Sequence, residues 1–327
     1  MAGTEKPAAL VDHNSAEALL KRMEWTVLRR LDGLLQGDHR TLMRGAGLDL
    51  ADLREYQHHD DVRHIDWNVT ARLQQPYVRQ FTEDREMSAW FLVDLSASVD
   101  FGSDVVTKRS LARDFVAVLA RLLTRHSNKV GVLLYGTEVD TVIPARGGRH
   151  HVLHLMQRMA ARPVQTPTGA TQLQQLLRTA QGTILRRSSL FVVSDFISAP
   201  GWEKTLGQLT TRHEVTAVRL YDPLEMDLPD LGLVTMRDAE TGEQLVVDTH
   251  DPGFRRRFAA AAERRESGLR QALAQAGVDT LELATDDDLA SAILRFTDLR
   301  KQRSRLANWN GRPRSASDHL SAWKAAR

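Results

Sequence analysis

Histidine and aspartate, the side chains that most often bind metals and transfer protons, are concentrated in HHDDVRHIDW at residues 58–67. The histidines lack the i, i+4 spacing of a helical metal-binding pair. In an extended segment, however, alternate residues share a face, so His58 and His64 would lie with Asp66. One hypothesis is therefore a metal-dependent hydrolase that uses these three residues on phosphate or ester substrates.

The same stretch also allows a structural hypothesis, in which its carboxylates pair with nearby arginines. Bidentate Asp–Arg pairs are strong and directional, so they would suit a rigid junction with the domain that follows. In this hypothesis the tryptophan packs against that domain. The expected junction consists of Asp60, Asp61, Arg63, Asp66, Trp67 and Arg72, with Arg79 as a further partner. A partner-binding surface is a third interpretation.

A plainer set of residues, further along the chain, offers oxygen donors alone. Asp94, Ser96 and Ser98 form a DxSxS pattern after an apolar run, and alternation along an extended segment places them on one side. Thr171 follows a glycine-containing turn, and Asp195 ends another apolar run. Hard divalent cations such as Mg²⁺ prefer oxygen ligands, although Asp and Ser also commonly cap helices after strands. These five residues are the candidate metal ligands.

The elements that must position these residues are apolar runs separated by segments of helical periodicity. The runs are AWFLVDL, KVGVLLYG, SSLFVVSDF, EVTAVRLYD and VDTLELAT, which begin at residues 89, 129, 188, 214 and 278. Near-continuous apolar runs are typical of strands buried on both faces of a parallel sheet. We therefore expect a doubly wound, mostly parallel α/β fold of the Rossmann type, in which ligands bind outside the carboxyl ends of the strands.

Composition along the chain predicts an extension, a sheet domain and two tails. The expected order is a flexible tail at 1–15, a helical and irregular extension at 16–85, the sheet domain at 86–303 with an inserted β-hairpin at 231–249, and a basic flexible tail at 304–327. The stretch that is rich in histidine and aspartate belongs to the extension. The candidate metal ligands all belong to the sheet domain.

The composition favours a cytoplasmic protein that does not enter a membrane. The 327-residue chain has 42% hydrophobic residues and a formal net charge of +2. It has no cysteine, which excludes disulfides and thiolate metal sites and fits a reducing compartment. No apolar run approaches the roughly 20 residues of a membrane helix, and the N-terminal segment lacks the apolar core of a signal peptide.

Arginine-rich segments raise a further alternative, nucleic-acid binding. A helix expected at 252–276 carries Arg255, Arg256, Arg257, Arg264 and Arg265, and the segment 300–327 is basic. A basic face of this kind can contact phosphates. The arginines are interleaved with Ala and Glu, however, which is typical of a solvated helix face. The small net charge gives no independent reason to expect nucleic acid as a partner.

The oxygen donors resemble the metal-ion-dependent adhesion site (MIDAS) of von Willebrand factor A domains. That family has DxSxS, then a Thr after a glycine-containing loop, then an Asp after a buried strand; here DLSAS, TGAT and VVSD follow in that order. The resemblance implies that Ser96, Ser98 and Thr171 contact Mg²⁺, or another divalent cation such as Mn²⁺ or Ca²⁺, directly. Asp94 and Asp195 would act largely through water, and a partner's carboxylate could complete the coordination.

The stretch YQHHDDVRHIDWNVTAR at 56–72, followed by PYVRQFTEDRE, resembles the signature of the domain-of-unknown-function 58 family, which precedes a von Willebrand A-like domain. The resemblance continues through DLSASVDFG, TKRSLARDF, KVGVLLYG, LPDLGLV and ETGE. His59 stands where the family usually has Gly, and Val99 where Met is common. The resemblance implies a non-enzymatic partner of a MoxR-type AAA+ ATPase that helps to assemble or activate protein complexes, with a client protein supplying the carboxylate.

Overall fold

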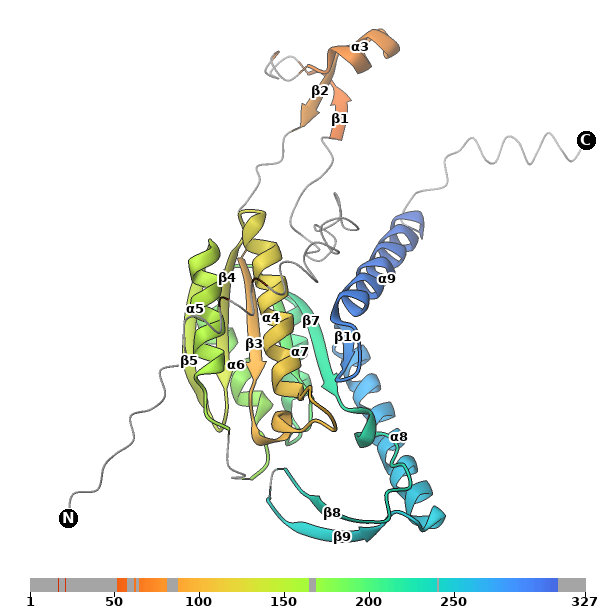
Figure 1. The fold of residues 1–327 in the computed structure, drawn as a ribbon. Coiled ribbons are helices and arrows are strands. Elements are labelled where there is room, and N and C mark those ends of the chain that lie inside the picture. Colours follow the sequence, from red (N-terminus) through yellow and green to blue (C-terminus); the bar gives the residue numbers. More distant parts are fainter. Residues whose placement is uncertain are drawn as a thin grey trace, which may run out of the picture.

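The computed structural model describes residues 17, 21, 52–57, 62, 65–80, 88–164, 169–239 and 241–310, with 52–54, 79–80 and 301–310 described by their backbone alone. Within these residues the main body is a six-stranded sheet with helices on both faces (Figure 1). The expectations for the tail at 1–15 and for most of the extension up to residue 51 lie outside the described residues.

The central sheet has the strand order β10-β7-β6-β3-β4-β5. Its strands are β3 (Ser88–Asp94), β4 (Lys129–Tyr135), β5 (Val139–Arg146), β6 (Ser189–Ser194), β7 (Glu214–Tyr221) and β10 (Asp279–Ala284). All run parallel except β5, which joins β4 antiparallel at one edge. Because β3, β4 and β6 are buried along almost their whole length, their sequences read as near-continuous apolar runs. The doubly wound α/β fold is confirmed.

Helices cover both faces of the sheet and complete two hydrophobic cores. One face carries α4 (Lys108–Arg125), α5 (Arg149–Ala160) and α9 (Leu289–Asn310), and the other carries α6 (Leu173–Thr183), α7 (Trp202–Thr210) and α8 (Pro252–Gln275). Side chains alternate along β3, so Phe91 and Val93 enter the first core while Trp90 and Leu92 enter the second. Since both faces are covered, the ends of the strands are the places where polar side chains can meet a ligand.

A β-hairpin leaves the sheet domain after β7, as expected, and the last helix is longer than expected. β8 (Leu233–Arg237) pairs antiparallel with β9 (Gln244–Asp248). The expected boundary of the C-terminal tail at 304 needs correction, because α9 continues to Asn310. Residues 304–310 contain neither Gly nor Pro, so nothing in them stops a helix. Among the described helices, none is both long enough and apolar enough to span a bilayer.

The part of the extension that the structure describes is more regular than expected. β1 (Asp52–Glu55) pairs antiparallel with β2 (Tyr77–Gln80), and the short helix α3 (Trp67–Leu73) lies between them in sequence (Figure 1). Asp66 starts this helix, because its carboxylate accepts hydrogen bonds from the backbone N–H groups of Asn68 and Val69 at 3.0 and 3.2 Å. Trp67 is 69% exposed, so its expected packing against the sheet domain is not found among the described residues.

Gly131 provides a test of the packing between β3 and β4. A Cβ atom at this position would lie 2.6 Å from the ring of Trp90, which covers the glycine from the neighbouring strand. We expect Gly131→Ala to lower the free energy of unfolding by about 1–3 kcal/mol, because the buried ring must move. Gly268→Ala is the control: this helical glycine has open space around it, and alanine there should stabilise by about 0.5–1 kcal/mol. Urea unfolding measures both, and equal effects would contradict the packing described.

Candidate metal site

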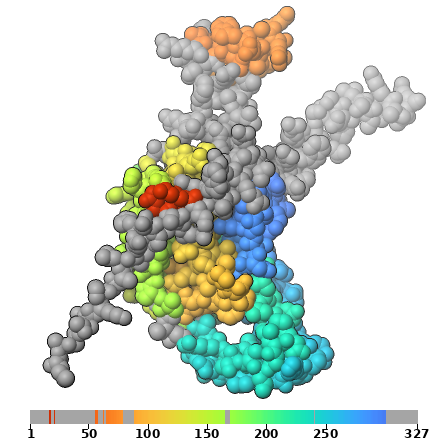
Figure 2. All heavy atoms as spheres, in the orientation of Figure 1, coloured from red at the N-terminus to blue at the C-terminus, as the bar shows by residue number. Residues whose placement is uncertain are grey.

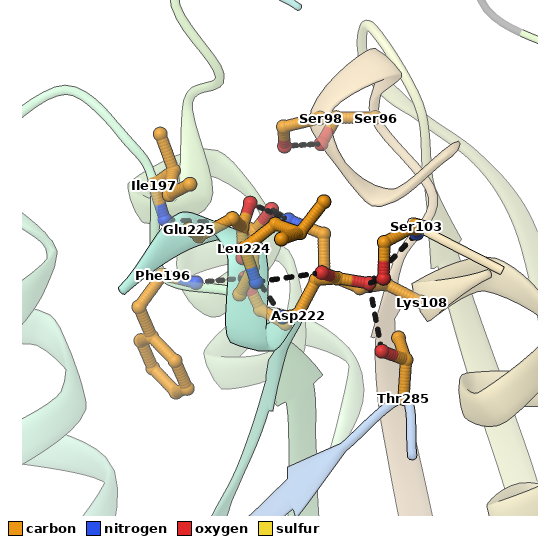
Figure 3. A network of polar contacts seen from close by, with 12 residues as sticks. Ser96, Ser98, Ser103, Lys108, Phe196, Ile197, Asp222, Leu224, Glu225 and Thr285 are labelled. Carbon is orange, nitrogen blue, oxygen red and sulfur yellow. Dashed lines mark hydrogen bonds and ion pairs between the residues drawn. The ribbon is translucent and has the colours of Figure 1, made fainter. Parts of the chain in front are cut away.

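The end of β3 carries the DxSxS residues. Asp94 is fully buried, and its carboxylate accepts hydrogen bonds from the Ser96 backbone N–H at 2.9 Å and from the Ser194 hydroxyl at 2.7 Å. The 3₁₀ helix η4 (Ala97–Asp100) follows, and the hydroxyl oxygens of Ser96 and Ser98 lie 3.2 Å apart (Figure 3). Ser96 occupies the N-cap position of η4, yet its hydroxyl makes no capping hydrogen bond. Helix capping therefore does not account for this serine.

The end of β6 brings a second carboxylate beside the first. β6 pairs with β3 in parallel, so Asp94 and Asp195 both lie where the strands end. We call this side of the sheet, formed by the carboxyl ends of the strands, the carboxyl edge. Phe196 then adopts a left-handed φ of 58°, which is uncommon for a bulky residue. Its backbone N–H donates to the Ser194 hydroxyl at 2.9 Å, and the N–H of Ile197 donates to Oδ1 of Asp195 at 3.0 Å. This turn fixes one oxygen of Asp195 and leaves Oδ2 for another partner.

Thr171 is held at this edge by its backbone. Its carbonyl oxygen accepts hydrogen bonds from the Ala199 N–H at 2.9 Å and from the Ser198 hydroxyl at 2.8 Å. The next residue, Gln172, donates its backbone N–H to the hydroxyl of Tyr135 at the end of β4, at 2.9 Å. The loop after Asp195 and the end of β4 thus clamp the segment that carries Thr171. All five candidate metal residues are buried, with exposures between 0% and 5%.

A lysine that the sequence analysis did not single out lies within this cluster. Lys108 is the first residue of α4, its side chain is 0% exposed, and its ammonium group lies 2.8 Å from Oδ2 of Asp195 and 2.7 Å from Oε1 of Glu225. Burial alone would lower the pKa of Lys108, but the charges of Asp195 and Glu225 raise it above its ordinary value. The lysine is therefore a buried ammonium that two carboxylates hold, and Figure 3 labels one of them, Glu225.

Asp222 organises the adjoining part of the same edge. Its carboxylate accepts hydrogen bonds from the backbone N–H and hydroxyl of Ser103, from the Thr285 hydroxyl and from the Leu224 N–H, at 2.7 to 2.9 Å. Burial tends to raise the pKa of Asp222, but these hydrogen bonds hold it below its ordinary value. Asp222 thus connects the ends of β7 and β10 with the loop before α4, as Figure 3 shows.

The charges at the site do not balance. Burial, followed by the negative charge of Asp195, raises the pKa of Asp94 to about 6, so at neutral pH its carboxylate is mostly ionised at an electrostatic cost. Asp94, Asp195 and Glu225 carry one negative charge each when ionised, and Lys108 carries one positive charge. Two negative charges in this group of four residues are left uncompensated, which equals the charge of one divalent cation.

Two nearby arginines offset this imbalance only in part, because each has a carboxylate partner elsewhere, although the charge of Asp94 also acts on Arg162. Arg109 binds the carboxylate of Asp100 with two of its nitrogens, and Arg162 binds Asp140. Among the residues that the structure describes, no three His, Asp or Glu side chains gather in a metal-binding arrangement. A divalent cation at this edge would therefore depend on hydroxyl oxygens as well as on carboxylates. The donors present, which are hydroxyls and carboxylates, suit a hard cation such as Mg²⁺.

The other candidate sites are only partly described. Asp60, Asp61, Arg63, His58 and His64 lie outside the described residues, so the ionic junction and the hydrolase hypothesis stay predictions at these positions. Of the remaining junction residues, Asp66 caps α3, and Arg72 lies in the last turn of that helix. On the arginine-rich helix, Arg255 binds the Thr249 carbonyl oxygen and lies 3.5 Å from a carboxylate oxygen of Asp230.

Lys108, Glu225 and Asp222 are the residues that the sequence analysis missed, although local signals for them exist. A cation in the first turn of a helix opposes the helix dipole, so a lysine directly after the N-cap Thr107 requires a negative partner. The sequence Asp222-Pro-Leu-Glu225 has the form of a capping box, and both of its hydrogen bonds are present around η5 (Pro223–Glu225). These signals indicate that the residues have specific partners, but they do not predict that all three lie at the same edge of the sheet.

The raised pKa of Asp94 predicts how stability depends on pH. The folded state retains this proton up to about pH 6, whereas the unfolded state releases it near 3.8. Stability therefore falls as pH rises through this interval, by about 1 kcal/mol between pH 5 and 7.5. Asp94→Asn should remove that loss. In EDTA, the free energy of unfolding of the variant minus that of the parent should therefore be larger at pH 7.5 than at pH 5. Urea unfolding of this variant and of Asp227→Asn, an exposed control, tests this; an equal difference at both pH values would refute it.

The solved structures that this chain matches have low sequence identity to it. The protein BatB from Bacteroides thetaiotaomicron is 14% identical with a TM-score of 0.43, and the match covers 67% of this chain and 99% of that chain. The VWA domain of SpRpn10 is 12% identical with a TM-score of 0.37, over 64% of this chain and 94% of that chain. The fold assignment itself rests on the strand order and helix placement described above.

Sequence relatives are much closer. A protein of Mycobacterium tuberculosis (strain ATCC 25618 / H37Rv), which is described as uncharacterized, is 37% identical over 297 residues, covering 89% of this chain and 92% of its own length. The model of a family described as "Protein of unknown function DUF58" matches residues 52–268, which include β1, α3 and β2, the candidate metal site and the hairpin. The chain therefore belongs to the DUF58 family.

Proposed function

We propose that this protein is a non-enzymatic interaction module that binds partner proteins in a divalent-metal-dependent manner. The observation that supports the proposal is the set of buried oxygen donors at the carboxyl edge, together with two negative charges that Lys108 does not compensate. Mg²⁺, or another divalent cation such as Mn²⁺ or Ca²⁺, would supply a positive centre with an open coordination position. A carboxylate from a client protein would bind there.

Within this proposal the residues have distinct tasks. The hydroxyls of Ser96, Ser98 and Thr171 are the neutral ligands, and the buried carboxylates of Asp94 and Asp195 supply charge, largely through water. Neutral ligands leave more of the cation's charge available to a partner than carboxylate ligands would. The hydrogen bonds of Asp94 to Ser96 and Ser194 orient it before any ligand arrives. The chain thus supports an electrostatic docking point rather than a general acid or base.

Exposed apolar side chains near the site support a protein as the partner. The loop before α4 exposes Phe101, Val105 and Val106, and the hairpin segment exposes Leu231, Leu233, Leu245 and Val246. We call these seven residues the apolar rim. In Figure 2 the hairpin stands clear of the main body and leaves a gap between them. Clusters of exposed apolar residues are typical of protein-binding surfaces, and they would contact the chain around the incoming carboxylate.

The resemblance to the DUF58 signature motivates a more specific partner. We propose that a MoxR-type AAA+ ATPase and a client protein are the partners, that assembly or activation of protein complexes is the outcome, and that the cytoplasm is the location. The protein would contribute specificity, because it selects a carboxylate at the metal site and apolar side chains at the rim. The ATPase would contribute the energy for remodelling.

Capture from native lysate tests metal dependence. We expect the parent protein to capture an AAA+ ATPase in Mg²⁺ and to lose it in EDTA, as identified by mass spectrometry. Ser96→Ala should reduce the capture at least about tenfold, because it removes a proposed neutral ligand. Ser188→Ala is the matched control: this serine is also buried, but it directly precedes β6 and so lies at the amino ends of the strands. Equal capture in Mg²⁺ and EDTA would refute metal-dependent docking.

The apolar rim gives a second, metal-independent test of the same function. Leu233 and Val246 are 74% and 66% exposed, so changing both to serine should leave the melting temperature unchanged. We expect the Leu233→Ser/Val246→Ser variant to lose about 1–3 kcal/mol of partner affinity, as is typical when interface anchors are removed. Leu185→Ser is the control, since this leucine is 63% exposed at the end of α6. Unchanged capture by the double variant would exclude the hairpin from the interface.

A further inference from the structure

The position of Lys108 is difficult to explain as ordinary packing. An ammonium group with no solvent exposure is stable only when paired and hydrogen-bonded. Lys108 satisfies this condition with two carboxylates from different parts of the chain: Asp195 follows β6, and Glu225 ends η5. The ammonium therefore contacts one of the carboxylates that a divalent cation would need.

The two carboxylates that hold Lys108 are not equivalent. Asp195 is 3% exposed and belongs to the candidate metal site. The Glu225 side chain is 17% exposed, and its second oxygen accepts the backbone N–H of Asp222 at 3.0 Å. If Asp195 turned towards a metal, Lys108 would still have a carboxylate partner in Glu225. The lysine can therefore release Asp195 without becoming an unpaired buried charge.

We propose that Lys108 is a built-in counter-ion that competes with a divalent cation for Asp195 and so sets the metal affinity of the site. The inference rests on the proposed metal dependence and adds a residue that tunes it. Without metal, the ammonium holds Asp195 in place and limits repulsion from Asp94. With metal, Lys108 stays with Glu225 while Asp195 serves the cation. The site is thus assembled before metal binds, and its affinity is lower than its oxygen donors alone would give.

Titration of the purified full-length protein with Mn²⁺ tests the proposal, with free Mn²⁺ measured by electron paramagnetic resonance. Lys108→Met keeps an unbranched side chain that is one heavy atom shorter and removes the charge. We expect this variant to bind Mn²⁺ about tenfold more tightly than the parent or better, because Asp195 no longer has a competing partner. In EDTA the variant should melt at a lower temperature than the parent, and Mn²⁺ should restore more of its stability than it adds to the parent.

Arg109→Met is the matched control, because it removes a positive charge from the next residue of α4 that pairs with Asp100 rather than with Asp195. A change in Mn²⁺ affinity of less than about threefold is expected there, as for a general field effect. An equal gain in both variants, or equal or weaker binding in Lys108→Met, would overturn the competition.

Two further results separate this proposal from the proposed function. If Lys108→Met binds Mn²⁺ and the parent does not, the counter-ion role is supported and metal-dependent docking by the parent is refuted. If neither binds, both are refuted. Should Lys108→Met fail to fold, Glu225→Gln takes its place: Lys108 would then depend on Asp195 alone, and Mn²⁺ binding should weaken at least about threefold. Unchanged or tighter binding by Glu225→Gln would also overturn the proposal.

Discussion

The burial of three aspartates at one edge of the sheet is the constraint on which the rest of this structure depends. An ionised carboxylate inside a protein must be hydrogen-bonded or paired, or it destabilises the fold by several kcal/mol. Asp94, Asp195 and Asp222 meet this requirement in different ways. Asp94 accepts hydrogen bonds from a backbone N–H and a hydroxyl. Asp195 accepts one from a backbone N–H and forms an ion pair with the buried ammonium of Lys108. Asp222 accepts hydrogen bonds from two backbone N–H groups and two hydroxyls.

These contacts join elements that are distant in sequence. Ser194 connects β6 to β3, Lys108 connects α4 to β6 and η5, and Asp222 connects β7 to the loop before α4 and to β10. Each hydrogen bond of this kind contributes only modestly to stability. Removing one partner, however, leaves a buried charge unpaired, and its full desolvation cost then destabilises the fold. The edge is therefore held as one network of hydrogen bonds and ion pairs within the chain. Such preorganisation is what a docking point requires.

The sequence predicts the fold well because period and burial are local signals. The apolar runs at β3, β4 and β6 indicate a parallel sheet, and DxSxS, Thr171 and Asp195 fall at its carboxyl edge by topology alone. What the sequence does not show is pairing across long separations. Lys108 meets Glu225 only because α4 begins where η5 ends in space, and β1 meets β2 across more than twenty intervening residues. In the sequence, charged residues of this kind cannot be distinguished from those on a solvated helix face, because their partners are distant along the chain.

Glu225 links the candidate metal site to the segment that precedes the hairpin. One of its oxygens binds Lys108 at the candidate metal site, and the other binds the backbone of Asp222 at the start of η5. Residues 226–232 lead from η5 to β8 of the hairpin, whose leucines and valine form part of the apolar rim. A change of charge at Asp195 would therefore alter, through Lys108, the forces on Glu225, which precedes the hairpin in sequence. The two surfaces to which we assign docking, one ionic and one apolar, thus lie on either side of η5 along the chain, and we expect their occupancies to influence each other.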